Sequence, residues 1–146
     1  MKVALDTNIL AYAEGINDDA KRKAAWSMIE KLPDDTVIPV QALGELLNLL
    51  VRKAGRTADD ACKSIHRWSN AFPLVETSAS VLLAAADLAT RKFSFWDAVI
   101  LSAASEADCQ LLLSEDMQQG FVWRGVTIVN PFSKMPHPLL RALFSR

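Results

Sequence analysis

Short apolar segments alternate with longer segments of helical character along most of this chain. The predicted strands are residues 2–5, 37–40, 74–76, 111–113 and 126–129. The predicted helices are residues 7–14, 18–31, 41–53, 57–71, 79–91 and 95–107. Parallel strands need a long crossover between them, and helices supply it while covering both faces of the sheet. The alternation therefore predicts an α/β fold with a parallel sheet.

The length and the apolar segments predict one domain without a membrane segment. The 146 residues, of which 51% are apolar, can bury one core. The longest apolar stretches, residues 81–86 and 98–104, are too short to cross a membrane. Asp6 interrupts any signal-peptide core near the N-terminus, so we expect a cytoplasmic protein.

Neither the cysteines nor the bulk charge assigns a function. Cys62 and Cys109 are far apart and lack Cys-x-x-Cys spacing, which argues against a disulfide framework and a zinc–thiolate site. With 16 basic and 17 acidic residues, the formal net charge is −1. Many nucleic-acid-binding domains are strongly basic, so the bulk charge does not indicate this function, and the positions of individual charges must be considered.

Four acidic residues stand out because of their positions. Asp6 directly follows the first predicted strand, and Asp116 lies just after the fourth. Glu45 lies within the third predicted helix, and Asp97 lies in the core-like sequence Phe95–Leu101. Sites in open α/β sheets lie beyond the carboxyl ends of strands, so we expect Asp6 and Asp116 to face one cleft. An ionised Asp97 in apolar surroundings needs a compensating cation or hydrogen-bond donors.

Convergence of these carboxylates would be unfavourable without a counter-ion. At about 5 Å and an effective dielectric of about 20, each pair repels by roughly 3 kcal/mol. A Mg²⁺ or Mn²⁺ ion would remove this repulsion, and carboxylate oxygens suit both ions. Such an ion also activates a water molecule and orients a phosphodiester for in-line attack. The acids are therefore candidates for a divalent-metal site.

Two of the acids also fit a purely structural role. Asp6 precedes a predicted helix and can serve as its N-cap. Ser94 and Asp97 have the spacing of a capping box, in which both side chains bond to backbone N–H groups. On the sequence alone, the structural and the functional interpretations both stay open for these acids.

The other two acids have alternatives as well. Glu45 shares a helix face with Asn48 and Arg52, so Glu45 and Arg52 could form a structural ion pair. Asp116 could be an ordinary turn residue, and Glu115 beside it competes for the same functional role. The functional interpretation is favoured by the joint placement of four acids at strand ends and on buried-looking helix faces.

Four short segments that contain these acids occur in a recognisable order. They are Leu5–Leu10, Leu43–Leu46, Phe95–Ala98, and Leu113–Met117 followed by Gly120. In order and spacing they resemble the PIN-domain family, and most closely the VapC-like toxin ribonucleases of type II toxin–antitoxin pairs. The resemblance implies a single Rossmann-like three-layer sandwich with a parallel sheet. It covers residues 1–132, a PIN-like nuclease domain, and leaves residues 133–146 as a C-terminal tail that packs on the domain or on a partner.

The resemblance also implies which residues form the site. Four acids would be catalytic and would bind one or two Mg²⁺ or Mn²⁺ ions: Asp6, Glu45, Asp97 and Asp116. Three polar residues would support them: Asn8, Ser94 and Ser114. Arg52 and Lys53 lie one to two turns beyond Glu45 and could contact RNA phosphates. As a solvated helix end, the same two residues would instead stabilise the C-terminal dipole.

By this resemblance, the chain is expected to be a metal-dependent endoribonuclease that hydrolyses RNA phosphodiester bonds. It is also expected to be the toxin of a type II toxin–antitoxin pair. The expected partners are RNA, a cognate antitoxin and a second copy of the chain. The dimer is expected because helices 41–53 and 57–71 carry more apolar residues than a small sheet needs. The alternative is a non-catalytic RNA- or partner-binding module. His66 and His137 lie outside the four segments, so a histidine-based nuclease is not favoured.

Overall fold

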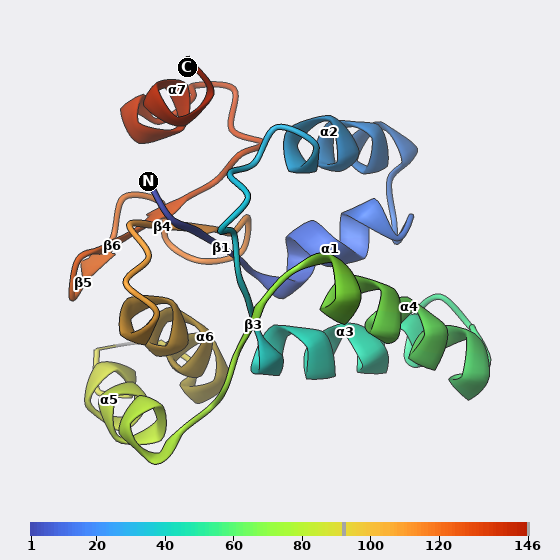
Figure 1. The fold of residues 1–146 in the computed structure, drawn as a ribbon, viewed down its shortest axis with the longest axis horizontal. Coiled ribbons are helices and arrows are strands. Elements are labelled where there is room, and N and C mark those ends of the chain that lie inside the picture. Colours follow the sequence, from blue (N-terminus) through green and yellow to red (C-terminus); the bar gives the residue numbers. More distant parts are fainter. Residues whose placement is uncertain (92, 146) are drawn as a thin grey trace.

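A mostly parallel sheet runs through the computed structural model, which describes residues 1–91 and 93–145 (Figure 1). Its strands, in spatial order, are β1 (Val3–Leu5), β4 (Leu111–Leu113), β6 (Val126–Val129) and β5 (Val122–Trp123). Strand β4 is parallel to both β1 and β6, while β5 runs antiparallel to β6. The predicted parallel sheet is therefore confirmed, with an added antiparallel edge.

A second parallel pair lies on the other side of β1. Strand β2 (Ile38–Pro39) pairs with β3 (Leu74–Val75), and Val37 exchanges backbone hydrogen bonds with Val3 and Leu5. The chain continues from β1 to β2 on one side, and β4 joins β1 on the other. The gap between β1 and β4 is therefore the switch point at which open α/β sheets place their sites.

Helices cover both faces of the sheet. They are α1 (Thr7–Ala13), α2 (Asp19–Ile29), α3 (Val40–Arg52), α4 (Ala58–Ala71), α5 (Ala79–Ala89), α6 (Phe95–Glu106) and α7 (Pro138–Phe144). Figure 1 shows α2 and α7 on one side of the sheet and α5 and α6 on the other. The six predicted helices all form, and their ends differ from the prediction by two residues or fewer, which is ordinary for helix termini.

Three local features differ from the sequence prediction. Val40 begins α3 instead of ending a strand. Strand β5 was not predicted, because a two-residue strand has no alternation to detect. It is joined to β6 by Arg124 and Gly125, both at positive φ, as tight hairpin turns require. Residues 131–138 were predicted as a linker, but Pro138 occupies the first turn of α7, where a proline is well tolerated.

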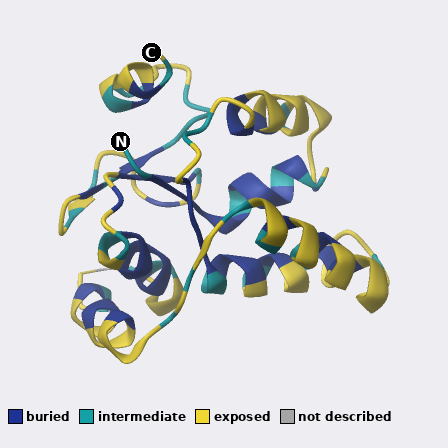
Figure 2. Cartoon of the chain, in the orientation of Figure 1, coloured by how far each residue is buried: buried dark blue, intermediate teal, exposed yellow. Residues whose placement is uncertain are grey.

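The core lies between the sheet and its helices (Figure 2). Strands β1 and β4 are buried at every residue. Helix α6 is buried over the successive residues Ala98–Ala104, so the sheet and its neighbours cover it on all sides. Leu140 and Leu143 of α7 join the same core, so this helix packs on the domain. The proposed boundary at residue 132 stays a prediction. Within the described residues, no helix is long and apolar enough to span a membrane.

Candidate functional site

A pocket of about 420 Å³ lies where β1 and β4 end, and all four predicted acids line it. Its lining comprises Asp6, Thr7, Asn8, Ala11, Tyr12, Ile16, Asn17, Glu45, Asn48, Leu49, Lys53, Asp97 and Asp116. The acids come from the ends of two neighbouring parallel strands and from helices α3 and α6. The expectation that strand-end and helix acids converge is therefore met by the fold.

Asp6 is almost completely buried and strongly hydrogen-bonded. Only 4% of its surface is exposed. The Thr7 backbone N–H donates to Asp6 Oδ1 at 2.7 Å, so Asp6 is indeed the N-cap of α1. The Ser114 hydroxyl donates to Asp6 Oδ2 at 2.6 Å, and the Asn8 amide donates to the same oxygen at 3.3 Å. The structural and the pocket-lining interpretations of Asp6 both hold.

The environment of Asp6 disfavours its charged form. Burial is the main cause, and the negative charges of Asp97 and Glu45 add to it. The hydrogen bonds from Ser114 and Thr7 oppose the shift but do not cancel it. Together these effects raise the pKa of Asp6 from 3.8 to about 7. A cation in the pocket would offset both causes, because it would compensate the lost hydration and the repulsion between the acids.

Glu45 is half-buried on α3 and points toward α1. Its Oε2 accepts a hydrogen bond from the Thr7 hydroxyl at 2.7 Å. Burial raises the pKa of Glu45, the bond from Thr7 opposes this, and the charge of Asp97 adds to it. In the described part of the chain, none of the ion pairs includes Glu45, so the alternative of a structural pair with Arg52 is not realised.

Asp97 and Asp116 complete the acidic lining. Asp97 lies in the first turn of α6, and its backbone N–H donates to the Ser94 hydroxyl at 3.2 Å. Burial raises the pKa of Asp97, a hydrogen bond with Ser94 opposes this, and the charge of Asp116 adds to it. Asp116 is exposed in the loop after β4. Half of the capping box that the sequence suggested is therefore present, and it does not remove Asp97 from the pocket.

Glu115, which competed with Asp116 on sequence grounds, has a different environment. It does not line the pocket. Lys21 Nζ donates to Glu115 Oε2 at 2.6 Å, and the Tyr12 hydroxyl donates to Glu115 Oε1. Burial opposes ionisation of Glu115, but the bonds from Lys21 and Tyr12 outweigh it and lower its pKa. Asp116 is therefore the pocket acid of this loop, and Glu115 is an ion-paired neighbour.

The predicted supporting residues divide into two groups. Asn8 and Ser114 both donate hydrogen bonds to Asp6, and the side-chain Oδ1 of Asn8 also accepts from the Glu115 N–H at 3.1 Å. Ser94 caps α6 but does not line the pocket. Of the two basic residues, Lys53 lines the pocket, whereas Arg52 does not.

Four polar lining residues were not among the predicted site residues: Thr7, Tyr12, Asn17 and Asn48. The Thr7 hydroxyl of α1 donates to Glu45, and Tyr12 lines the pocket from the same helix. The spacing of Asn8 and Tyr12 by four residues, on one helix face, was the available signal.

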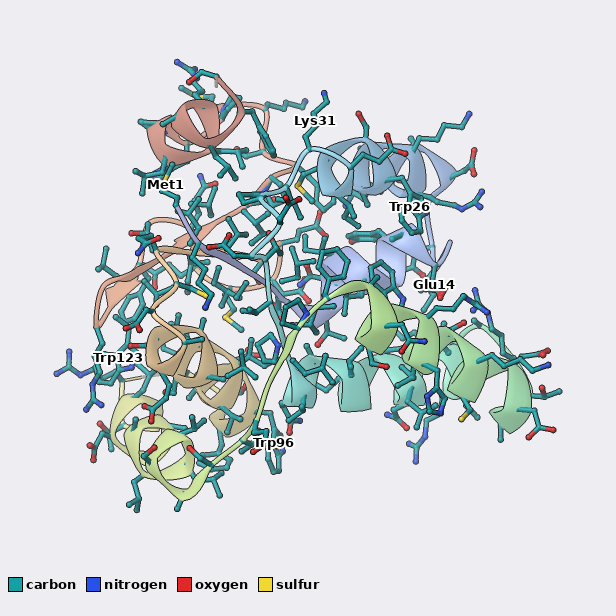
Figure 3. All side chains as sticks on the ribbon, viewed as in Figure 1. Met1, Glu14, Trp26, Lys31, Trp96 and Trp123 are labelled. Carbon is teal, nitrogen blue, oxygen red and sulfur yellow. The ribbon has the colours of Figure 1, made fainter. Side chains whose placement is uncertain are left out.

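The tryptophans are divided between packing and exposed positions. Trp26 and Trp68 stack at 5.6 Å between ring centroids, and Trp68 is buried. Trp123 is partly buried beneath Arg91 and Arg124. Trp96, the neighbour of Asp97, is 53% exposed at the start of α6 (Figure 3).

The donor set suits a hard divalent cation, although the side chains are not closed around one point. As they stand, no three His, Cys, Asp or Glu residues within the described ranges form a group that could hold a metal ion. Mg²⁺ keeps several water molecules and is usually bound through one or two carboxylates rather than an all-protein cage. Four carboxylates around one open pocket, three of them with raised pKa values, fit this mode of binding.

Comparison with known sequences identifies one family. The family model of the PIN domain matches residues 3–120, which include all four pocket acids. No curated protein matches the sequence significantly.

Solved structures share the fold at low sequence identity. The chain superposes on the sarcin–ricin-loop-cleaving toxin VapC20 of Mycobacterium tuberculosis with a TM-score of 0.67 and 21% identity, covering 78% of this chain and 89% of that one. It superposes on a chain of a Klebsiella pneumoniae toxin–antitoxin complex with a TM-score of 0.66 and 20% identity, covering 89% of this chain and 98% of that one. It superposes on VapBC2 of Rickettsia felis, bound to a DNA fragment from its promoter, with a TM-score of 0.64 and 16% identity, covering 88% of this chain and 97% of that one. The predicted architecture is thereby confirmed.

Proposed function

Because the chain belongs to the PIN-domain family, we propose that it is a metal-dependent endoribonuclease that hydrolyses RNA phosphodiester bonds. The observation that carries this proposal is the convergence of four acids on one pocket: Asp6, Glu45, Asp97 and Asp116. Such a pocket repels anions when it is empty. It can accept the negative phosphodiester of RNA only when a cation compensates the carboxylates.

These four carboxylates would hold one or two Mg²⁺ or Mn²⁺ ions. A bound ion of this type supplies a Lewis acid and an activated water for attack on phosphorus. Asp6 must lose its proton before its carboxylate can bind a cation, because its pKa in the metal-free pocket is about 7. Ser114 and the Thr7 N–H orient Asp6, and the Thr7 hydroxyl orients Glu45.

The pocket lining favours water over the RNA 2′-hydroxyl as the nucleophile. A histidine pair is a common means of removing the 2′-hydroxyl proton and protonating the leaving oxygen. Neither histidine lines this pocket: His66 lies on α4, and His137 caps α7. Acyclic products are therefore expected.

Lys53 is the basic residue best placed to contact the substrate. It lines the pocket at the end of α3, two turns beyond Glu45, and can meet a phosphate next to the one being cleaved. Arg52 is exposed on the same helix end and can add a second backbone contact. With a net charge of −1, the chain would depend on such local contacts to bind RNA.

We further propose that the chain is the toxin of a type II pair, acts as a homodimer and is silenced by an antitoxin. Three solved structures of this fold are the VapC20 toxin, a toxin–antitoxin complex and the VapBC2 complex. On α3, Leu46 and Leu50 are buried, whereas Leu47 and Val51 are 39% and 41% exposed. This exposed part of the predicted apolar surplus is available to a partner.

The test is RNA cleavage by the purified chain in the presence of Mn²⁺ or Mg²⁺. EDTA, Asp6→Asn and Asp97→Asn should each abolish cleavage while the fold persists. Asp87→Asn is the matched control, because Asp87 is an exposed acid on α5 that pairs with Arg124. Wild-type cleavage by either pocket variant would exclude the assignment. A chain that binds RNA but no Mn²⁺ would instead support the non-catalytic module.

A further inference from the structure

The loop that follows β4 is held by side chains from two other helices. Tyr12 of α1 and Lys21 of α2 both donate hydrogen bonds to the Glu115 carboxylate. Lys21 Nζ also lies 4.8 Å from the centre of the Tyr12 ring, and Phe132 packs edge-on against the same ring at 5.4 Å. We call Tyr12, Lys21 and Glu115 the loop clamp. It links α1 and α2 to the loop that carries Asp116.

The same loop is also held by contacts with Asp6 and Asn8. The Ser114 hydroxyl donates to Asp6 and accepts from the Met117 N–H at 3.2 Å. The Glu115 N–H donates to the Asn8 side chain. The backbone on both sides of Asp116 is therefore fixed by hydrogen bonds to other elements.

Asp116 itself is exposed and lacks such restraints. In the part of the chain that the structure describes, no side-chain hydrogen bond or ion pair includes its carboxylate, in contrast to Asp6 and Glu45. Its position in the pocket is consequently set by the backbone of its loop. A change in the contacts of the Glu115 side chain would therefore move Asp116 before it moved any other pocket acid.

We propose that the loop clamp is a positioning device, in which Glu115, held by Lys21 and Tyr12, sets where Asp116 stands and thereby sets the affinity of the pocket for divalent metal. This inference rests on the proposed function, because it assigns a role relative to the proposed metal. Glu115 is a positioning residue and not a metal ligand. Its charge is already compensated by Lys21, and it does not line the pocket.

The experiment is a double-mutant cycle read out as the Kd for Mn²⁺, measured by calorimetry on the full chain. Glu115→Ala should weaken Mn²⁺ binding about tenfold or more, as removal of residues that orient metal ligands typically does. In an Asp116→Ala background, Glu115→Ala should have no further effect, because the residue that it positions is gone.

Two further variants keep the test informative if Glu115→Ala does not fold. Lys21→Met leaves the loop sequence intact and should weaken Mn²⁺ binding in the same direction, again only when Asp116 is present. Lys23→Met is the matched control, because Lys23 lies on the same helix and pairs with the exposed Asp19 alone. It should leave the Kd unchanged.

Tyr12 offers a readout that needs no metal, because it is the single tyrosine of the chain. A ¹³C-tyrosine-labelled sample should give one ring signal, which should shift in Glu115→Ala and Lys21→Met but not in Lys23→Met. This would establish that the contacts of the clamp exist in solution.

The possible outcomes separate this inference from the proposed function. Wild-type protein that binds no Mn²⁺ would overturn both. If the wild-type protein binds Mn²⁺ and Glu115→Ala leaves the Kd unchanged, the positioning role alone is overturned. The same holds if Glu115→Ala weakens the affinity for Mn²⁺ equally in the presence and in the absence of Asp116. A loss of Mn²⁺ affinity that occurs only when Asp116 is present would support the positioning role. A merely structural contact would instead affect the protein in the same way with and without Asp116.

Discussion

The Ser114 hydroxyl donates a 2.6 Å hydrogen bond to the Asp6 carboxylate, and both residues are buried. The register of β1 and β4 produces this contact: Leu5 pairs with Leu113, so the next residue of each strand stands beside the other at the sheet edge. The two residues are 108 positions apart in the chain. A short parallel ladder thus creates the polar centre of the pocket.

We expect Ser114→Ala to weaken metal binding and to lower stability. It removes a bond that favours the charged form of Asp6, so the pKa of Asp6 should rise further and Mn²⁺ affinity at pH 7 should fall. The loss in affinity should diminish at higher pH. The unfolding free energy in urea should fall by about 1–3 kcal/mol, the cost of an unmade buried hydrogen bond. Ser69→Ala, which removes an exposed hydroxyl on α4, should change neither quantity.

In EDTA, the stability of the chain should decrease as pH rises from about 4 to above 7. Asp6 has a folded-state pKa of about 7 against an ordinary value of 3.8, so the folded state binds its proton more tightly than the unfolded state does. The contribution is fully present below the unfolded pKa and is lost as pH rises through the folded one, by up to about 4 kcal/mol. Urea unfolding at pH 5 and pH 8 measures it. Asp6→Asn should flatten this slope, and an equal slope in that variant would contradict the assignment.

Two glycines with equally open surroundings should respond to alanine in opposite directions. Apart from the adjoining backbone and the neighbouring residues in the chain, no atom lies within 4 Å of a Cβ built at Gly125 or at Gly44. Gly125 has a φ of +86°, so Gly125→Ala should destabilise the β5–β6 hairpin by about 1–2 kcal/mol. Gly44 lies within α3, so Gly44→Ala should stabilise the chain by about 0.5–1 kcal/mol. Thermal unfolding of the two variants measures these effects. Equal shifts of the unfolding temperature in both variants would contradict the explanation from backbone conformation.

The RNA products should carry a 5′-phosphate and a 3′-hydroxyl. This follows from attack by water at a pocket without histidine. Ligation-based mapping of the product ends distinguishes this outcome from 2′,3′-cyclic phosphates, which would require the RNA 2′-hydroxyl as nucleophile.

Expression of the chain alone should arrest growth, and co-expression of a small protein encoded beside it should reverse the arrest. Asp97→Asn should abolish the arrest, whereas Asp87→Asn should retain it. Light scattering should give the mass of a dimer, and Leu47→Lys should shift it toward the monomer, because Leu47 is an exposed apolar residue of α3. A monomeric chain without effect on growth would argue against the toxin proposal and leave the nuclease proposal standing.

The parts of the site that depend on local pattern were predictable from the sequence. Strand-end acids such as Asp6 and Asp116 could be brought together by the strand-end rule alone. Asp97 could be singled out because an acid in apolar sequence needs compensation. The capping alternative for Asp6 was also correct, so cap and pocket roles coexist in that residue, whereas only the Ser94 half of the capping box with Asp97 is present.

The parts that depend on distant contacts were not predictable in this way. The ion pair between Lys21 and Glu115 joins residues 94 positions apart, and no periodicity encodes it. Helix α7 was missed because Pro138 was read as the end of a linker rather than as a helix start. Strand β5 is defined by its pairing with β6 and by nothing in its own two residues.

The separation of Asp6 from Asp116 has a consequence during synthesis. Strand β1 leaves the ribosome before its partner β4, which is translated more than a hundred residues later. Until β4 and the residues after it have emerged, the nascent chain lacks both Ser114, which donates a hydrogen bond to Asp6, and the loop that carries Asp116. An incomplete chain, or one truncated before β4, therefore has no assembled acidic pocket. A ribosome that makes this protein is not exposed to its proposed chemistry until most of the domain can fold.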